Sequence, residues 1–286
     1  MTLSATVANK KLQTSSYAAL RFILIGGGLL ALLAIVATAA PFIAPHDPEA
    51  VEVPRVLGAP NLAHPFGSDV LGRDVLSRVI YGLRISLLVS LSAVAASLIF
   101  AVPMGLLAGY FGRWTDTIIS RSLDMILIFP AILLAITFIA ILGPGSIIAA
   151  LAIAVIYLPI LARVMRTSTL VVSRSDFVAG ARARGASHFR VLVGHVAPNA
   201  LGPVIVQASV LSAFALQLEA GLSFLGLGTQ PPTPSLGGML ADGRDVLTQA
   251  PWVEIFPGLV IVVAVLAFTY LGEGLRLAFD PRGVAQ

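Results

Sequence analysis

Residues 176–199 read DFVAGARARGASHFRVLVGHVAPN and form the longest polar, arginine-bearing interruption in the second half of a very apolar chain. Apolar runs long enough to be membrane spans flank this polar segment on both sides. We predict two short helices in it, joined at Gly185, because glycine suits the left-handed conformation that ends many helices. Ser187 is expected to cap the second helix and Pro198 to end it. The polar segment should therefore be a rigid helix–glycine–helix unit on one membrane face.

The composition indicates an all-α integral membrane protein. Of the 286 residues, 57% are hydrophobic and 11% are charged, whereas an ordinary soluble domain is about 25% charged. The chain has too few charges to cover a water-exposed surface. It contains no cysteine, which excludes disulfides and thiolate metal sites. No basic and aromatic stripe lies outside the apolar runs, so we expect no nucleic-acid partner.

Six apolar runs are long enough to cross a bilayer, which takes about 20 residues. They cover residues 22–44, 85–111, 118–142, 147–165, 201–227 and 255–279. The first run is longer than the apolar core of a signal peptide, so we predict a retained first transmembrane helix over 22–44. Gly105 and Gly109 form a small-xxx-small pair, which favours close packing of the second span against another helix.

The charge distribution predicts the orientation of these six spans. An even number of spans places both chain ends on one side, and most of the 18 lysines and arginines then share that side. The positive-inside rule assigns this side to the cytoplasm. We therefore predict cytoplasmic tails at 1–21 and 280–286. The five spans after the first form a core over 85–279, with a cytoplasmic loop at 166–200.

Residues 45–84 are predicted to be external. The first half of this segment is rich in proline and acidic residues and should be irregular. In the second half, apolar residues such as Val75 share one face of a helical pattern, while Arg73 and Arg78 share the other. This pattern predicts an amphipathic helix on the membrane surface, ending at Gly82.

The sequence lacks the motifs of several common enzyme classes. A phosphate-binding P-loop requires a lysine after its glycines, and the only lysines, Lys10 and Lys11, stand in no such context. The four histidines form no HExxH pair, and no GxSxG motif occurs. His188 and His195 are seven residues apart but lack an evident third ligand. We therefore predict a non-catalytic chain with no metal and no cofactor of its own.

Ionisable groups inside predicted spans are candidates for function, because an unpaired charge in lipid costs several kcal/mol. Asp124 lies three residues after Arg121, and an ion pair between them near the inner surface is expected. Glu219 lies in the fifth span, nearer its outer end. It is our translocation-path candidate, and a hydrogen-bonded packing role is the alternative.

The polar segment resembles a known loop. Its spacing matches the EAA–x3–G–x9–I–x–L–P motif of the membrane subunits of binding-protein-dependent ABC importers, and the matching positions are Ala179, Gly180, Ala181, Gly185, His195, Ala197 and Pro198. The motif's glycine and proline are present as Gly185 and Pro198. Its glutamate is replaced by Ala179, so the contacts made by that glutamate in the family cannot be assigned to this position.

Two further regions resemble one subunit type in that family. HPFGSDVLGRDVLSRVIYGLRISL (64–87) and LSFLGLGTQPPTPSLGGMLADGRDVL (222–247), with residues 250–261 and 271–282, are similar to the C-type permease of dipeptide and oligopeptide importers. This resemblance extends from about residue 40 to 283. It implies a type I ABC importer permease fold in a prokaryotic inner membrane. It also implies three kinds of partner: a homologous second permease, two cytoplasmic subunits that bind ATP and Mg, and an external solute-binding protein.

In that family the loop is a coupling helix that docks on the ATPase. The resemblance implies this role for Ala179, Gly180, Ala181, Arg182, Arg184, Gly185, Ala186, Ser187 and Pro198. Arg182 and Arg184 are candidates for pairing with acidic groups of the ATPase, and a solvated basic face is the alternative.

Other functions remain open at this point. Relatives of the subunit carry nickel, glutathione or other small solutes. A stand-alone secondary transporter would show ion relays and often internal repeats, and a membrane-bound enzyme would need a catalytic cluster. The sequence shows neither feature clearly.

Overall fold

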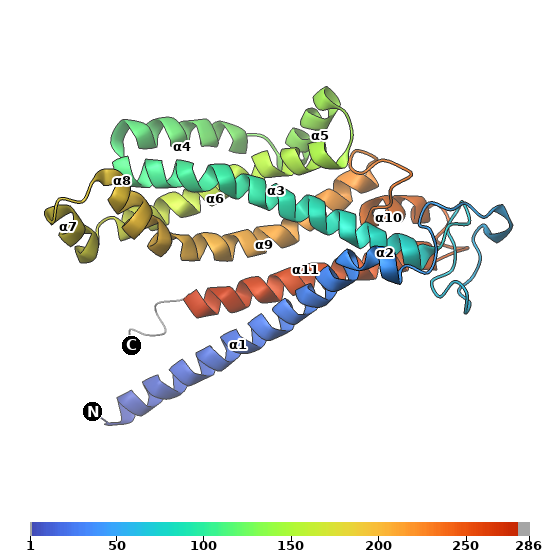
Figure 1. The fold of residues 1–286 in the computed structure, drawn as a ribbon, viewed down its shortest axis with the longest axis horizontal. Coiled ribbons are helices and arrows are strands. Elements are labelled where there is room, and N and C mark those ends of the chain that lie inside the picture. Colours follow the sequence, from blue (N-terminus) through green and yellow to red (C-terminus); the bar gives the residue numbers. More distant parts are fainter. Residues whose placement is uncertain (1, 280–286) are drawn as a thin grey trace.

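The computed structural model describes the backbone of residues 2–279 and the side chains of residues 17–279; the predicted tail 280–286 lies outside the described residues. The described part is helical and contains no strand (Figure 1). The helices are α1 (Thr2–Thr38), α2 (Ala40–Ile43), α3 (Val75–Phe111), α4 (Arg113–Leu127), α5 (Ala131–Leu142), α6 (Ser146–Val172), α7 (Asp176–Ala183), α8 (His188–Val191), α9 (Ala197–Phe224), α10 (Leu236–Arg244) and α11 (Trp252–Phe279). A short 3₁₀-helix spans Val53–Arg55, and a π-helix spans Leu192–Val196.

The helices confirm the prediction of a membrane protein. Among the described residues, 5 helices are long and apolar enough to cross a membrane, and the pair α4 and α5 makes a sixth if it counts as one span. These two helices are bent by 87° at their junction, so the predicted run 118–142 is not one straight helix. Pro130 stands immediately before α5. Proline disfavours helical backbone in the residue before it, which accounts for a break at Phe129.

Two clusters of buried residues hold the bundle together. One joins α3, α6 and α9 with the polar segment, and the other joins α1, α9, α10 and α11 with the first half of α3. Figure 1 shows α1 and α11 running side by side. Gly26 of α1 makes this approach possible, because a side-chain carbon there would lie 2.3 Å from the backbone nitrogen of Leu271.

Different helices and loops lie at the two ends of the bundle (Figure 1). The first turns of α1, the last turns of α11 and the pair α7 and α8 lie at one end, while α2, α10 and the long loop before α3 lie at the other. This arrangement agrees with the predicted topology, in which both chain ends and the polar segment share the cytoplasmic side. The orientation itself remains a prediction from the charge distribution.

The predicted surface helix before the second span is wrong. Asp74 caps α3, which runs without interruption through Gly82 to Phe111. Arg73 and Arg78 are 6% and 4% exposed, so the polar face is covered by protein. Gly82 does not end the helix; a side-chain carbon on it would lie 3.2 Å from the backbone nitrogen of Leu236. It allows the start of α10 to approach α3.

Candidate coupling and translocation site

The polar segment forms the predicted helix–glycine–helix unit. The first helix, α7, ends in a Schellman arrangement: the Ala186 N–H donates to the Ala181 carbonyl at 3.2 Å, and the Gly185 N–H donates to the Arg182 carbonyl at 2.9 Å. Gly185 has φ +81°, the left-handed conformation that a residue with a Cβ adopts at a cost. The hydroxyl of Ser187 accepts from the Arg190 N–H and caps α8, as predicted.

Pro198 does not end the second helix. The π-helix Leu192–Val196 joins α8 directly to α9, and Pro198 lies in the first turn of α9. A proline in a continuous α-helix clashes with the carbonyl four residues earlier, and the wider turn of a π-helix relieves that clash. The polar segment is therefore continuous with a membrane-length helix.

Buried side chains fix the polar segment to the bundle. Val178 and Val191 are fully buried, and Ala181 is 2% exposed. The Tyr110 hydroxyl, near the end of α3, lies 3.0 Å from His188 Nδ1. The Arg182 guanidinium lies over the Tyr110 ring, 5.0 Å from its centroid, which is a cation–π distance. Tyr110 thus connects both short helices to α3.

Most residues predicted for coupling are accessible. Ala179, Arg182, Arg184, Gly185, Ser187 and Pro198 are exposed, Gly180 and Ala186 are half-buried, and Ala181 belongs to the core. Sequence reasoning missed two large apolar side chains on the same unit, Phe177 and Phe189, which are 50% and 76% exposed. Their presence inside a polar, arginine-rich stretch is the sequence signal that could have identified them as contact residues.

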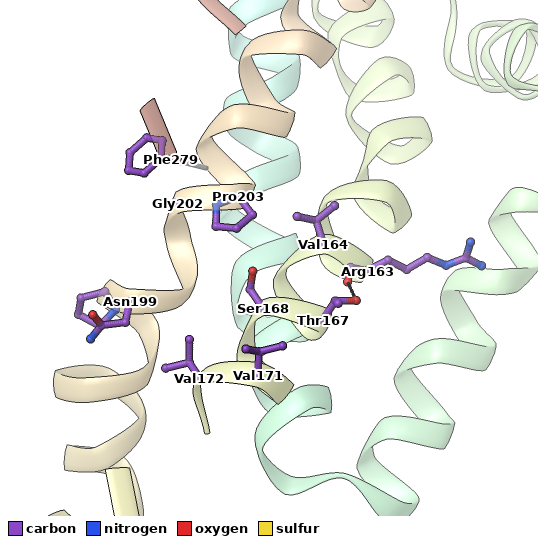
Figure 2. Close-up of a pocket in the computed structure, with 11 residues that line it drawn as sticks. Arg163, Val164, Thr167, Ser168, Val171, Val172, Asn199, Gly202, Pro203 and Phe279 are labelled. Atoms are coloured by element: carbon purple, nitrogen blue, oxygen red, sulfur yellow. Dashed lines mark hydrogen bonds between the residues drawn. The ribbon is translucent and has the colours of Figure 1, made fainter. Parts of the chain in front are cut away.

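A pocket of about 830 Å³ opens beside the polar segment. Figure 2 shows that α6 supplies Thr167 and Ser168, α9 supplies Asn199 and Gly202, and Phe279 closes one side. Most of the lining is apolar, with a few hydroxyl and amide groups, a composition common in small-molecule sites of this size. The pocket lies at the same end of the bundle as the exposed arginines.

Ion pairs connect α4 to α6 near this pocket. The Arg163 side chain points away from the pocket (Figure 2) and pairs with Asp124 of α4. The predicted pair of Asp124 with Arg121 is therefore wrong, because Arg163 lies within reach across the helix contact. Arg166 makes a second, two-point pair with Asp116, whose Oδ2 lies 2.6 Å from Nη2.

Glu219 lies on α9 and is 1% exposed. Its Oε1 accepts a hydrogen bond from the Ser223 hydroxyl at 2.8 Å. Its Oε2 is buried and has no hydrogen-bond partner among the described residues. The side chain lies inside this chain, away from the pocket, and its role in a path remains a prediction.

A cluster of buried arginine and aspartate side chains lies at the opposite end of the bundle. Arg73 Nε lies 2.7 Å from Asp69 Oδ2, and Arg73 Nη2 lies 3.3 Å from Asp242 Oδ2. Arg78 Nε lies 3.3 Å from Asp69 Oδ2. Burial raises the pKa of the Asp242 carboxyl, and the two arginines act against that rise. The cluster ties the loop before α3 to α10 at the end of the bundle opposite the polar segment, and the sequence pattern did not reveal it.

The fold is thus a bundle of membrane-length helices with an exposed, rigidly attached unit at one end and a pocket of about 830 Å³ beside it. Residues 101–283 match the family of binding-protein-dependent transport system inner membrane components. The chain belongs to this family, as the resemblance of the polar segment predicted.

Curated relatives cover most of the chain. The dipeptide transport system permease protein DppC of Alkalihalophilus pseudofirmus is 45% identical over 79% of this chain and 74% of its own length. The di/tripeptide transport system permease protein DppC of Pseudomonas aeruginosa is 43% identical over 90% and 87%. The glutathione transport system permease protein GsiD of Pectobacterium atrosepticum is 40% identical over 90% and 86%.

Solved structures share the fold. A chain of the MetNI methionine ABC transporter in an inward-facing conformation superposes with a TM-score of 0.57, at 17% identity, over 68% of this chain and 93% of that chain. An amino acid ABC transporter solved with histidines gives a TM-score of 0.55 at 16% identity, over 69% and 92%.

Proposed function

We propose that this chain is the permease subunit of an ATP-driven importer for dipeptides or oligopeptides. It forms half of the translocation path together with a homologous second permease. The exposed helix–glycine–helix unit at the end of the bundle carries this proposal, because it is a rigid contact surface on a chain without a P-loop of its own. The peptide cargo is supported by the names of the relatives at 43–45% identity.

The coupling step follows from how the polar segment is held. A loaded solute-binding protein docks on the external segments 45–84 and 228–254. Two cytoplasmic subunits bind ATP and Mg, and their closure displaces the polar segment. The π-helix passes this displacement to α9, and the spans change from an inward-facing to an outward-facing state. Ligands at two separate sites that bias the same two states are what allosteric coupling requires.

The contact with the ATP-binding subunits uses both charge and apolar surface. Arg184 is exposed and free to meet acidic groups of a partner, whereas Arg182 also packs on Tyr110 within this chain. Phe189, 76% exposed, supplies an aromatic anchor of the kind found at the centre of protein interfaces. The pocket beside α6 and α9 is the inner part of the path in this proposal.

Glutathione is the second cargo candidate, since relatives named for glutathione transport are 40–42% identical to this chain. Glutathione is itself a small peptide, so the same path suits both. Competition of unlabelled dipeptide, tripeptide and glutathione against a labelled dipeptide in vesicles distinguishes these cargoes.

Charge reversal tests the coupling role. The Arg184→Glu variant, alone and with Arg182→Glu, is reconstituted with its partner subunits in proteoliposomes. We expect transport-coupled ATPase activity and peptide uptake to fall about tenfold or more, as for loss of an interfacial charge contact worth about 2 kcal/mol. Arg21→Glu is the matched control, because Arg21 is an exposed arginine of α1 that lies outside both the polar segment and the predicted spans. Equal coupling in the Arg184 variants and the control would remove the polar segment from the mechanism.

Substitution of Gly185 tests the geometry of the polar segment independently of its charge. No atom lies within 4 Å of a side-chain carbon built on Gly185, yet its φ is +81°. Gly185→Val therefore strains the backbone without a steric clash and should misalign α7 with α8. We expect the complex to assemble but its ATPase activity to be less tightly coupled to transport. Normal coupling would contradict the proposed role of the polar segment.

A further inference from the structure

Three metal-ligand side chains converge at the external end of the bundle. His46, His64 and Asp74 each offer one ligand atom, and these atoms lie within 4.8 Å of one another. His46 follows α2, His64 stands in the loop before α3, and Asp74 is the cap of α3. The group is distant along the chain from the polar segment and lies within segment 45–84, which the proposal above assigns to docking of the solute-binding protein.

The carboxylate of Asp74 is held in a fixed orientation. Its Oδ2 accepts from the Ser77 N–H at 2.8 Å and from the Ser77 hydroxyl at 2.7 Å. Its Oδ1 faces His64 Nδ1 at 2.9 Å. The backbone N–H of His46 donates to the same Ser77 hydroxyl at 3.1 Å, which ties the loop after α2 to the start of α3.

One histidine nitrogen is left without a partner by this network. His46 Nδ1 is buried and makes no hydrogen bond in the part of the chain that the structure describes. It lies 3.8 Å from Asp74 Oδ2, and the ring stacks on His64 with centroids 4.4 Å apart. A buried, unpaired polar atom costs about 1–3 kcal/mol, and a metal ion at this point would satisfy it.

Hydrogen bonds satisfy both ring nitrogens of His64 but leave Nδ1 of His46 without a partner among the described residues. A proton on His64 Nδ1 donates to Asp74, and Nε2 then accepts from the Arg55 guanidinium. When a metal takes Nδ1, the proton moves to Nε2 and Arg55 must turn away. Arg55 is free to do so, because its side chain is 47% exposed and already pairs with Glu52 at 2.8 Å.

We propose that His46, His64 and Asp74 bind one divalent ion of the late first-row transition metals, with Zn²⁺ as the leading candidate. Two imidazoles and one carboxylate are a common ligand set for such ions. Zn²⁺ takes four ligands at about 2.0–2.2 Å. Because an imidazole nitrogen donates in the plane of its ring, the stacked rings of His46 and His64 would have to turn out of parallel to reach one ion, and water would fill the fourth position. The bound ion would fasten the loop containing His46 and His64 to the cap of α3.

Metal binding to the purified full-length chain, in its importer complex and with any polyhistidine tag removed, tests this proposal. After removal of metal by a chelator, Zn²⁺ is titrated by calorimetry and counted by elemental analysis, and Co²⁺ is followed by its visible absorption. One ion per chain is expected. His46→Ala should weaken binding about tenfold or more, since even the loss of a supporting residue around a metal costs about 10–100-fold.

Two further variants distinguish loss of a metal ligand from loss of the fold and from the loss of any histidine. Asp74→Asn retains a good helix cap but loses the anionic ligand, so the fold should persist while metal affinity falls. His195→Ala removes a histidine of the π-helix at the opposite end of the bundle and should leave affinity unchanged. Equal Zn²⁺ affinity in the wild type and His46→Ala, or no stoichiometric binding at micromolar Zn²⁺, would overturn the proposal.

Discussion

Gly105 of α3 lies directly against Met165 of α6: a side-chain carbon built on Gly105 would come within 2.5 Å of Met165 Cβ and 2.6 Å of the Ala162 carbonyl oxygen. One turn later, the same construction at Gly109 meets the Arg166 carbonyl oxygen at 2.6 Å. The two helices therefore touch backbone to backbone, which is the close approach that small residues at this spacing permit in membranes.

Gly105→Ala should destabilise the chain because the added methyl group has no room between two backbones. Overpacking of this kind costs about 1–3 kcal/mol, and thermal unfolding in detergent measures it. Gly28→Ala is the matched control. Gly28 lies within α1 with nothing within 4 Å of the added carbon, so alanine should be neutral or stabilising through its higher helix propensity. Equal melting of both variants would contradict backbone contact between α3 and α6.

Features that depend on local sequence could be predicted. Apolar run length gave the spans, the spacing of Gly105 and Gly109 gave a close helix contact, and the glycine of the polar segment gave its turn. Span length and the glycine turn are set within one stretch of sequence, whereas the spacing of Gly105 and Gly109 predicted a close contact without identifying α6 as the partner.

Features that depend on distant partners could not be predicted. Arg73 and Arg78 were assigned to a solvated face, but Asp242, 169 residues after Arg73, lies against both in the fold. Asp124 was paired with its sequence neighbour although Arg163 of α6 reaches it. Within the candidate site, the sequence did not predict the π-helix before Pro198, because a proline usually marks a helix boundary. Whether a helix can continue through a proline depends on the backbone of the turn before it.

Asp69→Asn should destabilise the external end of the bundle strongly. Asp69 is 1% exposed and faces both buried arginines, so the amide would leave the half-exposed Asp242 as their one carboxylate in ion-pair distance among the described residues. Removing one partner of a buried ion pair costs about 3–5 kcal/mol, measured as a drop in melting temperature of the complex. Asp245→Asn, whose side chain is 76% exposed beside Arg244, should change stability by less than about 1 kcal/mol. Similar losses in both variants would show that burial of the cluster does not matter.

Glu219→Gln should keep the stability of the chain, because the amide oxygen still accepts from the Ser223 hydroxyl. Glu219→Leu should lower stability by about 1–3 kcal/mol, since it leaves that buried hydroxyl without its partner. Peptide uptake by the stable glutamine variant then separates the two roles. A path-lining carboxylate predicts slower uptake, whereas a packing role predicts unchanged uptake. Unfolding of the glutamine variant would contradict the hydrogen-bond argument itself.

Ser168→Trp should block the pocket between α6 and α9. Ser168 is half-buried and lines the 830 Å³ cavity beside Thr167 and Gly202, and an indole ring there occupies space that a small peptide would need. We expect uptake of labelled dipeptide into proteoliposomes to fall at least about tenfold, a barrier of about 1.4 kcal/mol. Ser168→Ala is the control and should transport normally, because it removes only a hydroxyl. If the tryptophan variant is stable and still imports peptide at the wild-type rate, the cavity lies outside the translocation path, and the route must follow the contact with the second permease instead.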